Sequence, residues 1–370
     1  MTEILCVVGA RPNFMKIAPI MDAFARQPIA AKLLHTGQHY DPAMSESLFL
    51  QLGIPRPDIN LEVGSASHAV QTANIMRAFE PVLDAERPRA VLVVGDVNST
   101  LACALVAAKK NIKVIHVEAG LRSGDRAMPE EVNRVLTDQV SDLLYTTERS
   151  AQANLLREGI APERIHFVGN VMIDTLLTHR RRAVPAEQTL GAAPSRRYAV
   201  VTLHRPSNVD NAQVLRGLLE TLATIARDMD VIFPIHPRTQ STAAQHQLTP
   251  LLETPGIRLL PPQGYLEMLG LMSDATLVLT DSGGIQEETT ALGVPCITVR
   301  DNTERPITIT EGTNTLTGPH PDAILACVAD VLTSGGKRGR TPEYWDGQAA
   351  VRIAAHLRAW LDGATPDMPA

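Results

Sequence analysis

The sequence predicts an α/β protein built from two Rossmann-like domains in tandem. Short apolar runs alternate with longer amphipathic stretches along the whole chain, as expected for parallel strands that helices bury on both faces. The chain has 370 residues, more than a single hydrophobic core usually supports. A weakly patterned segment, His179–Arg197, divides the alternation into two series, and we take it as the interdomain connection.

The first series predicts an N-terminal domain at residues 1–178. Helices that separate its strands include Pro12–Arg26, Ser67–Glu86 and Thr100–Lys109. The strands are expected at Ile4–Val8, Ala31–His35, Ala90–Val94, Lys113–Val117, Leu143–Thr146 and Ile165–Val168.

The second series predicts a C-terminal domain at residues 194–345, followed by a helix at 346–370 that could pack back on the N-terminal domain. Its strands are expected at Tyr198–Thr202, Val231–Pro234, Ile257–Leu260, Ala275–Thr280 and Cys296–Val299. Ligands of open α/β sheets bind at the carboxyl ends of the strands. We therefore expect the active site in the cleft between the two domains.

Composition excludes several classes of function. A net charge of −6 without a long basic run argues against nucleic acid as a partner, and we interpret the run His179–Arg182 as a solvated helix end. The four cysteines lie far apart in apolar segments, which favours reduced thiols over a zinc site. No segment reaches the roughly 20 apolar residues of a membrane span, and a strand begins at residue 4, so we expect a cytoplasmic protein. The fingerprints of nicotinamide and ATP binding are missing, and no cofactor or metal is expected.

The turn after the first strand, VVGARPNFMK, has features of an anion site. Gly9 permits a sharp turn, and Pro12 suits the start of a helix. Arg11 and Lys16 add positive charge near that helix N-terminus, which itself attracts anions. The alternative is an ordinary strand-to-helix turn with two surface cations.

Acidic residues follow two further strands. In VVGDVNST, Asp96 follows a buried strand, and the hydroxyls of Ser99 and Thr100 could cap the next helix. In VIHVEAGLRSGD, His116 and Glu118 share one face of a strand. His116 and Glu118 are two candidate metal ligands without a third, which favours a packed histidine over a metal site.

The segment MPEEVNR opens a helix with Glu130 and Glu131 in its first turn. Acids in that position stabilise a helix electrostatically, which is the simplest interpretation of both. Together with Asp96 and Glu118, however, Glu130 would complete an acid–base cluster on one side of a sheet.

The second domain repeats histidines and glycines at strand ends. His204 and His236 each lie in a loop beside an arginine, which favours contact with phosphate for His204. In VLTDSGGIQEE, the backbone N–H groups of Ser282, Gly283 and Gly284 could close on a phosphate at a helix start. One turn further along, the carboxylate of Glu288 could accept both hydroxyls of a ribose, although ordinary first-turn charge also explains it.

The ordered set of these motifs resembles one family. GARPNFMKIAPI, TGQHYD, GDVNST, HVEAGLRSGD, PEEVNR, LHRPSN, DSGGIQEE and RDNTERP are similar to the motifs of the non-hydrolysing UDP-N-acetylglucosamine 2-epimerases. The resemblance covers residues 9–306 and implies a fold of the glycosyltransferase-B type and a homodimer. It also implies the interconversion of UDP-GlcNAc and UDP-ManNAc without a cofactor, through loss of UDP to 2-acetamidoglucal and its re-addition. The product would serve cell-surface polysaccharide synthesis.

The resemblance carries roles over to particular residues. It implies acid–base carboxylates at Asp96, Glu118 and Glu130, with His204 as a further catalytic group. The residues that it implies for UDP binding are Arg11, Lys16, His204, Ser282, Gly283, Gly284 and Glu288.

Two positions depart from the family pattern. Pro206 replaces the second arginine of the usual HRREN loop, while Gln38, His39 and His236 still match positions of an allosteric UDP-GlcNAc site. Trp345 stands where the family commonly has glycine, and we expect it to affect the packing of the terminal helix.

Three other functions use the same nucleotide-binding turn. A retaining UDP-sugar glycosyltransferase would need an acceptor site, and a non-catalytic sensor would tolerate loss of the acids. A hydrolysing epimerase would release ManNAc and UDP. Sugar substrates modified at C3 or C6 also stay open.

Overall fold

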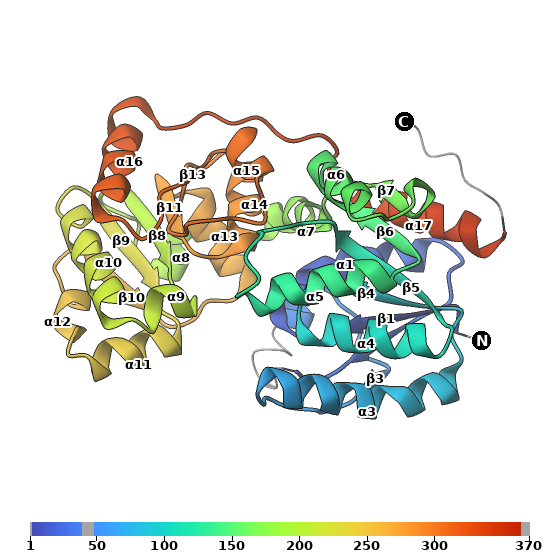
Figure 1. Cartoon of the computed structure of the whole chain (residues 1–370). Coiled ribbons are helices and arrows are strands. Elements are labelled where there is room, and N and C mark those ends of the chain that lie inside the picture. Colours follow the sequence, from blue (N-terminus) through green and yellow to red (C-terminus); the bar gives the residue numbers. More distant parts are fainter. Residues whose placement is uncertain (1, 39–47, 364–370) are drawn as a thin grey trace. The chain divides into compact units, whose positions relative to one another are not determined.

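The computed structural model describes residues 2–38 and 48–363 and divides into two compact units. Unit 1 contains the described residues up to Thr178 together with 343–363, and unit 2 is His179–Pro342. Each unit is built around a parallel sheet with helices on both faces (Figure 1). The predicted class of two Rossmann-like domains is confirmed.

The sheet of unit 1 has seven parallel strands in the order β3-β2-β1-β4-β5-β6-β7. Apolar side chains from β1, β4 and the helices against them form one continuous core that includes Leu5, Val91 and Phe79. The strands are β1 (Ile4–Val8), β2 (Ala31–His35), β3 (Ile59–Asn60), β4 (Ala90–Val94), β5 (Lys113–Ala119), β6 (Leu143–Thr146) and β7 (Ile165–Phe167).

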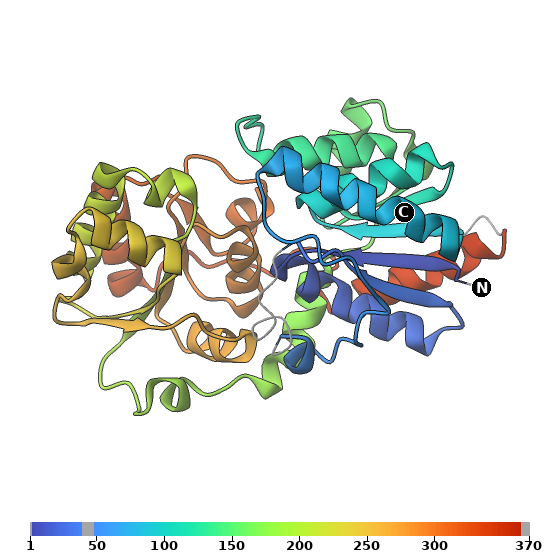
Figure 2. The same cartoon turned by 90° about the horizontal axis from the view of Figure 1, so that it is seen from below.

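Helices cover both faces of this sheet. Figure 2 shows α3 (His68–Glu86) and α4 (Asn98–Lys109) on one face and α1 (Arg11–Arg26) with α17 (Ala349–Leu361) on the other. Further helices of unit 1 include α5 (Pro129–Val140), α6 (Arg149–Arg157), η1 (Pro162–Arg164) and α7 (Val171–His179), whose last residue belongs to unit 2.

The sheet of unit 2 has six parallel strands in the order β10-β9-β8-β11-β12-β13. They are β8 (Tyr198–Thr202), β9 (Asp230–Pro234), β10 (Ile257–Leu260), β11 (Leu277–Thr280), β12 (Cys296–Thr298) and β13 (Asn314–Leu316). The helices are η2 (Arg180–Arg182), α8 (Ala186–Leu190), α9 (Pro206–Val209), α10 (Ala212–Ile225), α11 (Pro237–Gln245), α12 (Thr249–Leu252), α13 (Tyr265–Ser273), α14 (Gly283–Leu292), α15 (Ile307–Thr310) and α16 (Pro321–Ser334).

The segment 179–197, which we took as the interdomain connection, is packed within unit 2. Ala186 and Leu190 of α8 are buried in a hydrophobic cluster of unit 2. The backbone N–H of Val184 donates to Leu266 O at 3.0 Å. The apolar pattern of the segment is weak because its short helix buries only two residues, Ala186 and Leu190. The three arginines of η2 are exposed, as expected for a solvated helix end.

The helix α17 is attached to unit 1 by buried polar contacts. The carboxylate of Asp174, on α7, accepts the N–H groups of Ala349 and Ala350 at 3.2 and 2.7 Å, so that it satisfies donors in the first turn of α17. Trp345, just before this helix, is buried and donates from Nε1 to Thr147 O at 3.3 Å.

We expect Asp174→Ala to lower the free energy of unfolding by roughly 1–3 kcal/mol, because it leaves two buried N–H groups without their acceptor. Chemical denaturation followed by circular dichroism would measure the loss. Asp346→Ala is a suitable control, since its carboxylate is half exposed. Equal stability of the wild type and Asp174→Ala would show that the cap is not needed.

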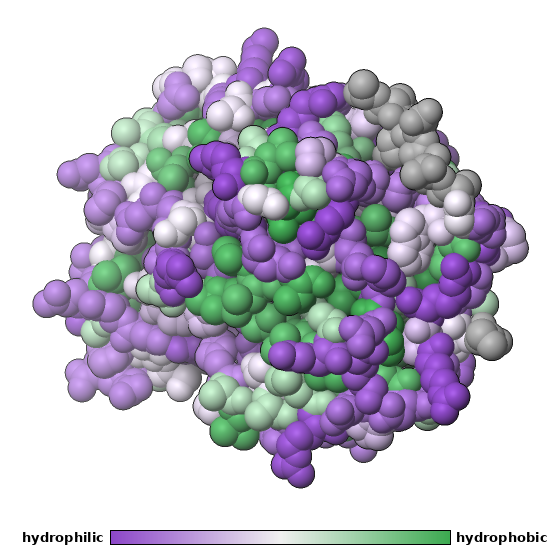
Figure 3. Space-filling view, turned by 45° about the vertical axis from the view of Figure 1, so that its right-hand side comes forward, coloured by the Kyte–Doolittle hydropathy of each residue, from purple (hydrophilic) through white to green (hydrophobic). Residues whose placement is uncertain are grey.

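The surface mixes polar and apolar side chains. Figure 3 shows hydrophobic side chains gathered between mostly hydrophilic ones on one face of the molecule. Among the described helices, none is long and apolar enough to cross a membrane.

Candidate active site

The turn that carries Asp96 is fixed by side chains from three helices, α1, α4 and α5, and from one strand, β5. Three consecutive carbonyl groups at the end of β4 accept side-chain hydrogen bonds. Val94 O accepts from Asn13 Nδ2 at 2.9 Å and from Thr100 Oγ1 at 3.0 Å. Gly95 O lies 2.8 Å from His116 Nε2, and Asp96 O accepts from Asn133 Nδ2 at 2.9 Å. Backbone polar groups at this strand end are therefore held in one arrangement.

The predicted capping role of Ser99 and Thr100 is wrong. The helix α4 begins at Asn98, and its N-cap is Val97, which has no polar side chain. The Thr100 hydroxyl donates back to β4, whereas Ser99 Oγ donates to Gln38 Oε1 at 2.6 Å. Both hydroxyls therefore fix neighbouring segments instead of the helix end.

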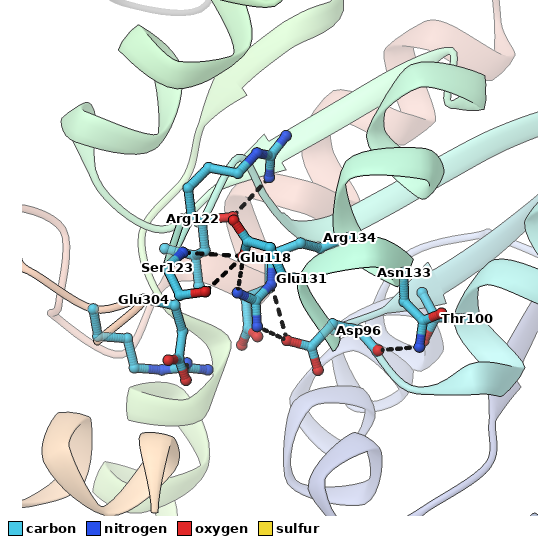
Figure 4. Close-up of polar contacts among 12 residues, drawn as sticks. Asp96, Thr100, Glu118, Arg122, Ser123, Glu131, Asn133, Arg134 and Glu304 are labelled. Atoms are coloured by element: carbon cyan, nitrogen blue, oxygen red, sulfur yellow. Dashed lines mark hydrogen bonds and ion pairs between the residues drawn. The ribbon is translucent and has the colours of Figure 1, made fainter. Parts of the chain in front are cut away.

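The Asp96 carboxylate is paired with an arginine that the sequence analysis did not single out. Asp96 Oδ2 lies 2.5 Å from Nη2 of the buried Arg134, on α5. Nη1 of the same guanidinium lies 2.5 Å from Glu131 Oε2 (Figure 4). One cation thus joins two carboxylates, and the i,i+3 spacing of Glu131 and Arg134 was the only trace of this in the sequence.

Glu131 belongs to this network and Glu130 does not. Glu131 accepts the N–H groups of Ser123 and Gly124 at 3.0 and 2.9 Å. Burial raises its pKa, but these N–H groups and the Arg134 guanidinium outweigh burial and hold the pKa below its usual range. Glu130 is half buried and has no hydrogen bond or ion pair with any described residue. Glu130 therefore keeps a carboxylate that no described side chain engages.

Glu118 is placed by a local irregularity of β5. The register between β5 and β6 shifts between Val117 and Ala119, and Glu118 has a φ of 73°, in the left-handed region that favours glycine. Its carboxylate is buried, and Oε1 lies 2.6 Å from Lys16 Nζ. A strained backbone conformation at a buried ion pair is typical of functional sites.

Lys16 and Arg11 differ in their surroundings, although the family resemblance assigns both to UDP. Arg11 is exposed at the start of α1, whereas the Lys16 side chain is 5% exposed. A Cβ added to Gly95 would lie 2.8 Å from Lys16 Nζ and 3.8 Å from Glu118 Oε1. The Lys16–Glu118 pair therefore packs directly against the turn that precedes Asp96.

His116 is a packed histidine, as the sequence analysis favoured. Its Nδ1 lies 2.6 Å from Asp138 Oδ1, and neither side chain is exposed. Within residues 2–38 and 48–363, no group of three or more potential ligands could hold a metal ion.

Part of the predicted allosteric set lies in unit 1. Gln38 Oε1 accepts from both the N–H and the hydroxyl of Ser99, and the Gln38 side chain is buried. His39 lies outside the described residues. A Cβ added to Gly9 would lie 2.1 Å from Ser99 Oγ, so only glycine fits beside this contact.

In unit 2, a buried aspartate organises the loop that carries His204. Asp281 accepts the N–H groups of His204 and Arg205 at 3.0 and 2.9 Å, and its Oδ1 lies 2.9 Å from His204 Nδ1. Asn208 Nδ2 donates to it at 3.2 Å. Burial raises the pKa of Asp281, but the His204 ring and the backbone N–H groups outweigh it and lower the pKa. The His204 ring itself is 42% exposed.

The turn Ser282–Gly284 forms the start of α14. Ser282 is the N-cap, and the helix runs from Gly283. A Cβ on Gly283 would lie 2.5 Å from Glu304 Oε1 and 2.8 Å from Arg305 Nη1. Glycine at 283 thus lets a buried Glu304–Arg305 pair approach the helix N-terminus, where N–H groups and the helix dipole favour an anion.

Glu288 lies one turn into α14 and is buried. Burial, together with the neighbouring charge of Glu287, raises the pKa of Glu288 to about 7, although a hydrogen bond from Tyr265 opposes this. Glu287 is paired with Arg305 at 3.1 Å. The two adjacent acids therefore differ, because among the described residues an arginine pairs with Glu287 and none pairs with Glu288.

His236 lies near His204. Their ring centroids are 6.0 Å apart, and His236 Nδ1 accepts the N–H of Arg238 at 3.2 Å.

Known proteins with similar sequences and structures identify the family. The family model for UDP-N-acetylglucosamine 2-epimerase matches residues 22–358. A UDP-N-acetylglucosamine 2-epimerase of Methanococcus maripaludis is 42% identical over 341 residues, covering 90% of this chain and 93% of the relative. A UDP-2,3-diacetamido-2,3-dideoxy-D-glucuronate 2-epimerase of Pseudomonas aeruginosa is also 42% identical, covering 96% of this chain and 99% of the relative.

Among solved structures, the UDP-GlcNAc 2-epimerase of Methanocaldococcus jannaschii in complex with UDP-GlcNAc and UDP is similar to this chain, with a TM-score of 0.89 and 39% identity. The match covers 96% of this chain and 99% of that one. The family resemblance of the sequence motifs is thereby confirmed, and the chain belongs to the UDP-N-acetylglucosamine 2-epimerase family.

Proposed function

We propose that this protein is a non-hydrolysing UDP-N-acetylglucosamine 2-epimerase, an isomerase that interconverts UDP-GlcNAc and UDP-ManNAc. The observation that carries the proposal is the pair of carboxylates at neighbouring strand ends, Asp96 and Glu118, each held by a cation. Inverting C2 requires one group to remove a proton and another to return it on the opposite face. Two positioned carboxylates meet that requirement.

The proposed reaction begins when a carboxylate of unit 1 removes the C2 proton while the C1–O bond to UDP breaks. The electron pair of the C–H bond forms the double bond of 2-acetamidoglucal, and the diphosphate leaves with the C1–O pair. UDP then adds back at C1 as a proton is delivered to the other face of C2. Asp96, Glu118 and Glu130 are the candidate acid–base groups, and no described residue pairs with Glu130.

Unit 2 would bind UDP and stabilise it as a leaving group. The N–H groups at the start of α14 suit the diphosphate, and Glu288 suits the ribose hydroxyls. His204 is oriented by Asp281 through Nδ1, and in its imidazolium form it would also donate from Nε2 to a phosphate oxygen. In this proposal the carboxylates of unit 1 and the UDP-binding residues of unit 2 act on the same substrate, so neither unit would catalyse alone.

The proposal predicts that UDP affinity falls below neutral pH. The pKa of Glu288 is about 7 in the free protein, so the group is protonated below that pH. Binding the ribose as a carboxylate then requires loss of a proton, and affinity should fall about tenfold for each pH unit below 7. Calorimetric titration from pH 5.5 to 8 would measure this. Glu288→Gln is the control, because UDP ionises equally with both proteins. Identical pH profiles would remove Glu288 from the ribose site.

A second candidate differs only in the sugar. The Pseudomonas aeruginosa relative is named for a glucuronate with acetamido groups at C2 and C3, and it is as similar in identity as the Methanococcus maripaludis relative. Removal of the C2 proton and loss of UDP would be the same for that sugar. Activity with each UDP-sugar, measured side by side, decides between the two.

Proton NMR in D₂O tests the function directly. Purified protein with UDP-GlcNAc, without added metal or nicotinamide, should produce UDP-ManNAc with deuterium at C2. Free ManNAc with an equal amount of UDP would support a hydrolysing enzyme instead. Transfer of the sugar to an added acceptor would support a glycosyltransferase.

The proposal also includes a homodimer and a role in supplying UDP-ManNAc for cell-surface polysaccharide. Both rest on the family resemblance. Light scattering during size-exclusion chromatography would test the first, and polysaccharide analysis after gene deletion would test the second.

A further inference from the structure

The proposed mechanism makes no use of His116, a buried residue of unit 1. His116 is on β5, two residues before Glu118, and it is fully buried. Its Nε2 lies 2.8 Å from Gly95 O, and Gly95 immediately precedes Asp96. Its Nδ1 lies 2.6 Å from Asp138 Oδ1. The ring therefore connects the Asp96 turn to helix α5.

The partners of the ring determine how it is hydrogen-bonded. A backbone carbonyl can only accept, so Nε2 must donate to Gly95 O. Asp138 Oδ2 already accepts from the Gly120 N–H at 3.1 Å and lies 2.7 Å from Arg122 Nη2. One hydrogen bond joins His116 Nδ1 to Asp138 Oδ1, and together with the bond from Nε2 it fixes the orientation of the ring.

The same helix that holds His116 through Asp138 also holds Asp96 directly. Arg134 and Asn133 of α5 contact the side chain and the carbonyl of Asp96. The Gly95 carbonyl, next to it, is held only through His116 among the described side chains. Gly95 has a φ of 65°, in the left-handed region. Without the bond from His116, the glycine backbone would be free to adopt other conformations, and the turn that carries Asp96 would shift.

We infer that His116 is a positioning residue for the reaction: its Nε2–H fixes the Gly95 carbonyl and thereby the Asp96 carboxylate, while Asp138 orients the ring. The chemical part of this inference rests on the proposed function. A displacement of about 1 Å at a catalytic group can cost on the order of 10²-fold in rate. The bond from Nε2, and not burial of the ring alone, is therefore the feature that matters.

Two substitutions separate the two hydrogen bonds. Counted in bonds from Cα, the side-chain nitrogen of glutamine replaces Nε2 of histidine, and that of asparagine replaces Nδ1. His116→Gln can keep the bond to Gly95 and lose the one to Asp138, whereas His116→Asn does the reverse. We expect kcat to fall roughly 10- to 100-fold in His116→Asn and to stay within about 3-fold of the wild type in His116→Gln.

Neither variant should change KM or the affinity for UDP, because the hydrogen bonds of His116 reach Gly95 and Asp138 and none of the residues assigned to UDP. His356→Gln is the matched control. It replaces another buried histidine of unit 1, which contacts Tyr145 Oη at 2.7 Å, and it should lower the melting temperature without lowering kcat. Equal losses of kcat in His116→Asn and His116→Gln would overturn the inference, since a purely structural role predicts them. If His116→Asn does not fold, His116→Met, which fills the space without a donor, takes its place under the same criterion.

Amide hydrogen exchange tests the same point without any enzyme assay. The Gly95 N–H donates to Val117 O at 3.0 Å, and its exchange should accelerate in His116→Asn but not in His116→Gln. Equal exchange rates in the two variants would also overturn the inference. If the wild type epimerises neither UDP-sugar, the proposed function fails, while the exchange experiment still decides the role of His116.

Discussion

Glu118→Gln is expected to lower kcat by about 10²–10⁴-fold, the range for loss of a general acid–base group. The substitution keeps the shape of the side chain but removes its charge. The buried Lys16 ammonium then loses the carboxylate 2.6 Å away, and removing one partner of a buried ion pair costs about 3–5 kcal/mol. Both a chemical and a structural effect are therefore expected, and they must be separated.

The double variant Lys16→Met/Glu118→Gln separates them. Removing both charges should recover most of the lost stability, because no unpaired buried charge is left, but it should not recover kcat. Thermal melts and NMR turnover assays of the two single variants and the double variant complete the cycle. A double variant that regains both stability and activity would assign Glu118 to structure alone.

The second large effect is expected for Asp281→Ala in unit 2. This change removes the acceptor for two backbone N–H groups, the Asn208 amide and the His204 ring. A fully buried carboxylate with several donors is costly to delete, and we expect the free energy of unfolding to fall by about 3–5 kcal/mol. The His204 loop should also lose its fixed conformation, so UDP affinity should fall.

Asp210→Ala is the control for this loss. Asp210 is paired with Arg238, but both side chains are about half exposed, and such pairs contribute at most about 1 kcal/mol. The pKa of Asp281 is lowered in the folded protein, so its contribution exists above the unfolded-state pKa and is lost as the pH falls. Equal denaturation midpoints for Asp281→Ala and Asp210→Ala at neutral pH would contradict the prediction.

The parts of the fold that sequence predicts well are those fixed by local pattern. Buried parallel strands such as Ala90–Val94 are continuous apolar runs, and the structure has that strand with the expected bounds. The edge strands Ile59–Asn60 and Asn314–Leu316 escaped detection. Each has only two or three residues, some of them polar, so neither forms a recognisable apolar run. They are strands because they pair with a neighbouring strand of the sheet.

The candidate site divides in the same way. Asp96 and Glu118 are visible in the sequence because each lies at the carboxyl end of a recognisable strand. Arg134 contacts Asp96 across 38 positions, and Asp281 contacts the His204 loop across more than 70. No local pattern encodes such pairs, which arise when the sheet brings strand ends and helices together. The left-handed backbone of Glu118 is likewise a property of the bulge and not of a residue type.

The return of the chain to unit 1 has a consequence for biosynthesis. Unit 2 is one uninterrupted stretch of chain and is complete once residue 342 has left the ribosome. Most of unit 1 is translated first, but it lacks α17 until Ala349–Leu361 has emerged, and until then Asp174 has no helix to cap. Domains fold as units during synthesis, so the half of the protein made second is the first that can finish folding.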